Sequence, residues 1–102
     1  MTIPVPDNFD ESVRNFMRQL GYASYIHPKN NQENFQRRLT GDNYPRFHIY
    51  ITEKEKGRFL NLHLDQKQPS YAGGKMHSGE YEGKIVEEEA ERIKNALLKT
   101  QK

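Results

Sequence analysis

The stretch RFHIYITEKEKGRFLNLHLD, from Arg46 to Asp65, constrains the fold more than any other part of the chain. Apolar residues alternate with polar ones on both sides of a short charged segment, which is the pattern of two half-buried strands joined by a turn. Gly57 ends the charged segment, where a positive φ angle is commonly needed. The sequence therefore predicts an antiparallel hairpin with a four-residue loop at 54–57.

The register of this hairpin follows from its apolar residues. Directly opposed residues of an antiparallel pair point to the same side, so the apolar rows of both strands must share one face, and a one-residue slip would break this arrangement. The predicted core-face pairs are Phe47–Leu64, Ile49–Leu62 and Ile51–Leu60, with Glu53–Arg58 next to the turn. The predicted pairs on the opposite face are Arg46–Asp65, His48–His63, Tyr50–Asn61 and Thr52–Phe59.

A helix is predicted on each side of the strands. In the N-terminal one, apolar residues fall at i, i+4, i+7, i+8 and i+11, namely Phe9, Val13, Phe16, Met17 and Leu20. Asn8 with Glu11 fits a capping box, and Gly21 stands where helices commonly end. In the C-terminal helix, expected from residue 84, the apolar stripe is Val86, Ala90, Ile93 and Leu97, and Glu87–Glu89 would occupy the first turn.

The remaining segments complete a small α+β fold. Residues 1–7 read as an extended lead-in because Pro4 and Pro6 disfavour a helix, and residues 22–26 fit either a short strand or an irregular packing segment. Residues 34–40 suit a third strand, and 66–83 form a long glycine-rich loop. We therefore expect one domain over 1–102, with about three antiparallel strands and both helices on one face of the sheet.

Composition narrows the classes of function. The 102 residues are only 33% hydrophobic, the formal net charge is +2, and there is no cysteine. Disulfides, thiolate catalysis and cysteine-based zinc sites are therefore excluded. No stretch reads as a signal peptide or as a membrane span, so we expect a soluble, intracellular, cytoplasmic protein with no membrane partner.

The polar face of the sheet is the predicted functional surface. Its candidate binding residues are Arg38, Arg46, His48, Tyr50, Asn61, His63 and Asp65. Arginine forks suit phosphates, and tyrosine or histidine rings can stack on unpaired bases. The leading hypothesis is a non-enzymatic binding module for an anionic, nucleic-acid or protein partner, with no cofactor. The same residues also suit a solvent-exposed sheet face with no function.

Two other hypotheses use this face. A metal site, possible if the 66–83 loop folds over the sheet, would combine His48, His63 and His77, because zinc accepts three imidazoles plus water. Such a site, or the histidine pair acting as acid and base, would make the protein a hydrolase or nuclease. Alternatively, the uncovered side of the sheet would pair with a second copy to form a homodimer.

Overall fold

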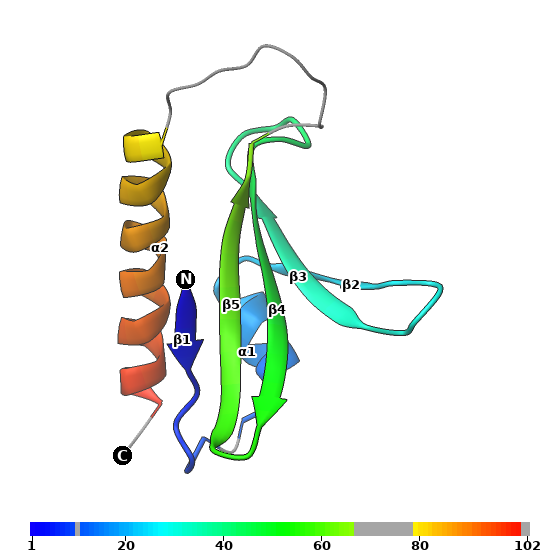
Figure 1. The fold of residues 1–102 in the computed structure, drawn as a ribbon, viewed down its shortest axis with the longest axis vertical. Helices are drawn as coiled ribbons and strands as arrows, with labels where there is room; N and C mark the ends of the chain where they lie inside the picture. The colour runs from blue at the N-terminus through cyan, green and yellow to red at the C-terminus, as the bar shows by residue number, and fades with distance from the viewer. Residues whose placement is uncertain (10, 67–78, 101–102) are drawn as a thin grey trace.

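The structure, a computed structural model, describes residues 1–9, 11–66 and 79–100. Its elements in chain order are β1 (Thr2–Pro4), α1 (Val13–Gln19), β2 (Ala23–Ile26), β3 (Glu33–Arg38), β4 (Arg46–Lys54), β5 (Gly57–Asp65) and α2 (Gly79–Lys99). The strands form one antiparallel sheet in the order β1-β5-β4-β3-β2 (Figure 1). The predicted α+β class, with one helix before the sheet strands β2–β5 and one after them, is confirmed.

The central hairpin has the predicted register. All eight predicted pairs are present, from Arg46–Asp65 to Glu53–Arg58. The loop is shorter than predicted, because pairing continues to Lys54–Gly57 and leaves only residues 55–56 in the turn. Gly57 has φ +131°, which a residue with a side chain rarely adopts, so a glycine is required here.

The sheet has five strands, and the prediction of about three was wrong. The lead-in contains β1, which pairs with β5 through Ile3–Leu60, and the segment after α1 contains β2, which pairs with β3. Ile3 and Val5 are buried while their neighbours Thr2 and Pro4 are exposed, so burial of alternate residues stabilises this strand. Proline is compatible with β1 because β1 lies at the edge of the sheet, where a backbone N–H is dispensable.

The first helix begins later than predicted. Its N-cap is Ser12, whose hydroxyl accepts a hydrogen bond from the backbone N–H of Asn15 at 3.3 Å, in place of the predicted cap at Asn8. Phe9 precedes the helix and is nevertheless buried, with its ring edge-on to that of Phe16. The predicted stop is confirmed, because Gly21 has φ +98° and its N–H donates to the carbonyl of Arg18.

The last helix begins earlier than predicted, at Gly79 inside the expected loop 66–83. An internal glycine costs a helix only about 1 kcal/mol relative to alanine, so Gly83 does not stop it. Glu87–Glu89 consequently lie in the body of the helix, and their predicted first-turn role was wrong. In the part of the chain that the structure describes, neither helix combines the length and hydrophobicity of a membrane span.

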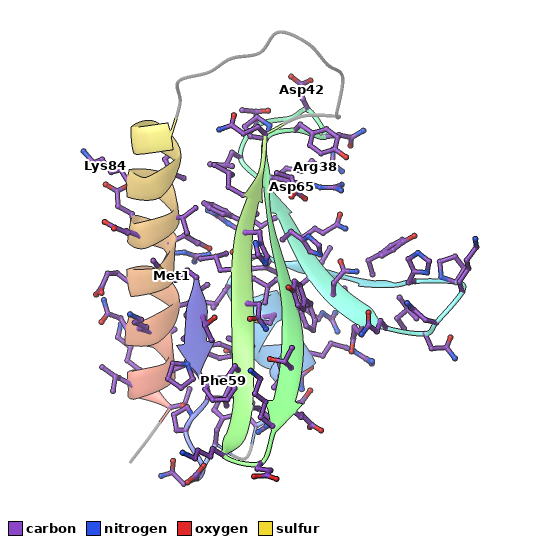
Figure 2. The ribbon with its side chains drawn as sticks, in the orientation of Figure 1. Met1, Arg38, Asp42, Phe59, Asp65 and Lys84 are labelled. Carbon is purple, nitrogen blue, oxygen red and sulfur yellow. The ribbon has the colours of Figure 1, made fainter. Side chains whose placement is uncertain are left out.

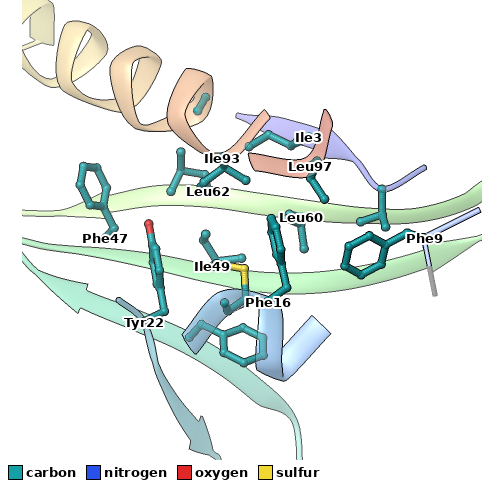
Figure 3. Packing of buried hydrophobic residues seen from close by; sticks show 14 residues of the cluster. Ile3, Phe9, Phe16, Tyr22, Phe47, Ile49, Leu60, Leu62, Ile93 and Leu97 are labelled. Carbon is teal, nitrogen blue, oxygen red and sulfur yellow. The ribbon is translucent and has the colours of Figure 1, made fainter. Parts of the chain in front are cut away.

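The core lies between the sheet and the two helices (Figure 3). Phe35, Phe47, Ile49, Leu60 and Leu62 come from the sheet, Phe16 and Met17 from α1, and Ala90, Ile93 and Leu97 from α2. Both helices therefore bury their apolar stripes on the same side of the sheet, as predicted. The opposite side carries no helix among the described residues.

Candidate binding face

The seven predicted binding residues lie on the uncovered side of the sheet, and we call this set the open face. They form three cross-strand rows, because each strand pair fixes which residues are opposed. The rows are Arg38–Arg46–Asp65, Gln36–His48–His63 and Asn34–Tyr50–Asn61. Alternation along residues 34–40 points Gln36 to the same face as Arg38; the structure fixes this register and adds Asn34 to the surface.

Three rings cluster at the middle of the open face. Tyr50 stacks on His63, with ring centroids 5.4 Å apart and planes inclined by only 9°. His48 is tilted against both rings, at 5.8 Å from Tyr50 and 6.3 Å from His63. Tyr50 remains 38% exposed, so the cluster offers aromatic surface to a ligand.

One end of the open face carries two arginines side by side. The Nε atom of Arg46 lies 3.4 Å from a carboxylate oxygen of Asp65, and its guanidinium lies 4.6 Å from the ring centroid of Tyr44. Arg38 is exposed and donates to the carbonyl of Gly41 at 3.4 Å. Figure 2 shows Arg38 and Asp65 together at this end of the sheet. The Asp65 carboxylate holds Arg46 in place and offsets part of the positive charge.

His48 lies between the arginine row and the other rings. Its Nδ1 atom is 3.6 Å from Asp65. Partial burial lowers the pKa of His48 below its ordinary value, and the charges of His63 and Arg46 act in the same direction, while the Asp65 carboxylate opposes them. His48 is therefore mainly neutral at pH 7, where one ring nitrogen donates a hydrogen bond and the other accepts one.

A hollow of about 360 Å³ adjoins the ring cluster on the β3 side. Pairing between β3 and β4 ends at Asn34–Tyr50. Beyond this pair, β4 continues alone to Lys54, while the chain that leads into β3 belongs to the 27–32 turn segment. The hollow lies where the two strands are no longer paired. Its walls include His27, Glu33, Asn34, His48, Tyr50 and Thr52. His27 is not among the binding residues predicted from the sequence.

Within the described residues, the pair of His48 and His63 has no third metal ligand. No three histidine, aspartate or glutamate side chains within the described ranges are placed to share a metal ion. His77 lies outside those ranges, so a zinc site built from His48, His63 and His77 stays a prediction.

The covered side of the sheet contains a buried polar cluster that was not predicted from the sequence. Glu89 accepts hydrogen bonds from the hydroxyl of Tyr22 at 2.6 Å and from two guanidinium nitrogens of Arg92 at 2.9 Å. Arg37, on the core side of β3, lies 3.8 Å from the same carboxylate. The signal was present, because Glu89 stands three residues after Val86 and so interrupts the apolar stripe of α2.

Comparison with known proteins adds no assignment. The chain matches no protein-family model, no curated protein and no solved structure. Its function must therefore be inferred from the chemistry of the open face.

Proposed function

We propose that this protein is a non-enzymatic binding module whose open face binds an anionic partner that carries phosphate groups. The observation that supports this most directly is the pairing of Arg38 with Arg46 at one end of a sheet face that no described helix covers. A guanidinium presents several N–H donors in a fixed plane, which suits the oxygens of a phosphate.

The way these arginines are held favours ligand binding. Arg46 is oriented by both Asp65 and the Tyr44 ring, so little side-chain freedom is lost when a ligand binds. Its ion pair with Asp65 is long, at 3.4 Å, and both side chains are partly exposed. Such a pair contributes little to stability, so an incoming phosphate can share or replace the carboxylate at small cost.

The proposal is tested with a fluorescently labelled single-stranded oligonucleotide of about 12 nucleotides, a length typical of single-strand sites. We expect binding that weakens steeply as salt is raised, because phosphate contacts release counterions. Arg38→Ala and Arg46→Ala should each weaken binding and reduce the salt slope by roughly 0.7 per lost phosphate contact. The measurement is fluorescence anisotropy at several salt concentrations.

Arg18→Ala is the matched control, because Arg18 is an exposed arginine on α1, on the covered side of the sheet. It removes the same charge without touching the open face. Equal losses for Arg18→Ala and Arg46→Ala would show that only net charge matters. That result, or no binding by the unsubstituted protein at low salt, would refute the proposal.

A further inference from the structure

The hollow beside Tyr50 has a stacking surface on one wall. Tyr50 lines the hollow, while the residue stacked on its ring, His63, lies on β5 and is not part of the lining. His63 stacks, with an offset, on the Tyr50 ring from the β5 side, which leaves the β3 side of the ring for the hollow. A planar ligand that entered would extend the stack of the two rings by one member.

The polar groups around the hollow offer both donors and acceptors. Lys29 N–H donates to Nδ1 of His27 at 3.1 Å, so Nδ1 is an acceptor and Nε2 is the ring nitrogen that can donate. Thr52 accepts from Asn61 through its hydroxyl oxygen and keeps its own proton to donate. The edge of a nucleobase likewise presents donors and acceptors in one plane.

The charges in the described lining indicate which part of a nucleotide the hollow suits. Glu33 accepts a hydrogen bond from Arg14 at 2.8 Å, and this bond, with a second from Ser24, lowers the pKa of Glu33. Glu33 is therefore ionised near neutral pH, and its charge is paired with that of Arg14. The described lining contains no lysine or arginine that could bind a phosphate, so it suits an uncharged base better.

We infer that the open face binds single-stranded nucleic acid, with one base stacked on Tyr50 in the hollow and the phosphate chain extending along β4 to Arg38 and Arg46. This inference rests on the proposed function and specifies its ligand. Arg46 and Tyr50 are four residues apart on β4, a span of about 13 Å at ~3.3 Å per residue. Because the cationic end and the hollow are separated, a ligand must be a chain to reach both.

The experiment compares two labelled probes of about 12 units, within the usual site size. One is a mixed-sequence single strand, made both as DNA and as RNA, and the other is an abasic sugar–phosphate chain of the same length. We expect the strand with bases to bind more tightly than the abasic chain. Tyr50→Ala should weaken binding of the strand with bases about tenfold, the order of one lost stacking contact, and leave binding of the abasic chain unchanged.

Two further variants make the result specific. Tyr50→Phe keeps the ring and should bind both probes as the unsubstituted protein does. Tyr25→Ala removes another exposed tyrosine, 47% exposed on β2, which lies on the same side of the sheet but outside the hollow, and should weaken binding less than Tyr50→Ala does.

Three results for Tyr50→Ala would refute the inference: normal affinity for both probes, an equal loss of affinity for both, or a loss of affinity no larger than that of Tyr25→Ala. Equal, arginine-dependent binding of the two probes would refute the base site and leave the proposed function standing. Binding of neither probe by the unsubstituted protein would refute both.

Discussion

The two sides of the sheet each hold a cluster of arginine and carboxylate, and the two clusters are built differently. On the covered side, the Glu89 side chain is 5% exposed and its hydrogen bonds are 2.6–2.9 Å long. On the open face, the Asp65 side chain is 32% exposed, and Arg46 and His48 lie 3.4 and 3.6 Å from it. The same chemistry therefore occurs once around a buried carboxylate and once around a partly exposed one.

The buried cluster is complete in itself. Both oxygens of Glu89 have partners, and Arg92 also donates to the carbonyl of Leu20 at 2.8 Å, which ties α2 to the end of α1. Among the described residues, no buried side-chain nitrogen or oxygen lacks a hydrogen-bond partner. Such a cluster has no capacity left for a ligand, and we assign it a structural role.

The protonation of the buried cluster follows from its surroundings. Burial alone would raise the pKa of Glu89, but the hydrogen bonds from Arg92 and Tyr22 and the nearby arginine charges outweigh it and hold that pKa below its ordinary value. Burial raises the pKa of Tyr22 far above its usual range, and the bond to Glu89 adds to the effect. Tyr22 therefore remains a neutral donor to an ionised carboxylate.

The largest effect is expected from breaking the buried cluster. Glu89→Ala should lower the free energy of unfolding by about 3 kcal/mol, because Tyr22 and Arg92 lose a buried charged acceptor. We place this at the low end for a buried ion pair because Arg92 and Arg37 are themselves partly exposed. Urea unfolding at pH 7 measures it.

The matched control is Glu88→Ala, one residue earlier on the same helix and exposed. It makes the same change in helix propensity and should stay within about 0.5 kcal/mol of the unsubstituted protein. Equal effects of the two substitutions would contradict the difference drawn between buried and exposed carboxylates.

A smaller loss is expected from Tyr22→Phe, which removes one hydroxyl and keeps the buried ring. The lost hydrogen bond has a charged acceptor, so the free energy of unfolding should fall by about 1.5 kcal/mol. Tyr25→Phe makes the same change on an exposed tyrosine of β2 and should be nearly neutral, within about 0.5 kcal/mol. If Tyr22→Phe were as neutral as Tyr25→Phe, the hydrogen bond to Glu89 would not stabilise the fold.

The sequence predicts correctly those elements whose hydrophobic pattern is compatible with only one strand register. The register of the β4–β5 hairpin follows from six aliphatic and aromatic residues and one glycine, and every predicted pair is present. The three-residue β1 is too short for its pattern to stand out, since Ile3 and Val5 alone mark the buried side. Its strand conformation depends on contacts with β5, which lies far along the chain.

The open face was predictable for the same reason as the hairpin, because alternation puts His48, Tyr50 and His63 on one side. The hollow was not predictable, since it depends on where β3 parts from β4. The buried cluster was missed because its members come from three distant segments, and a charged residue in a helix is most often exposed. In the sequence, Glu89 can be recognised only because it interrupts the apolar stripe and has Arg92 three residues later as a possible partner.

The smallest effect should come from His48, which tests the open face in the absence of any ligand. Its folded-state pKa lies below the ordinary value of about 6.5, so the unfolded chain takes up a proton first as the pH falls. The contribution of neutral His48 to stability is therefore full above pH 6.5 and decreases as the pH falls toward the folded pKa. His48→Gln should flatten this part of the stability profile.

An NMR titration of His48 reads the same environment directly. Asp65→Asn removes the one nearby negative charge that opposes the depression, so it should lower the pKa of His48 further, while Arg46→Ala should raise it. A bound phosphate chain adds negative charge to the face and should also raise it. A His48 pKa at or above about 6.5 in the free protein, or a rise on Asp65→Asn, would mean that His48 is not held between Asp65 and the rings as the structure shows.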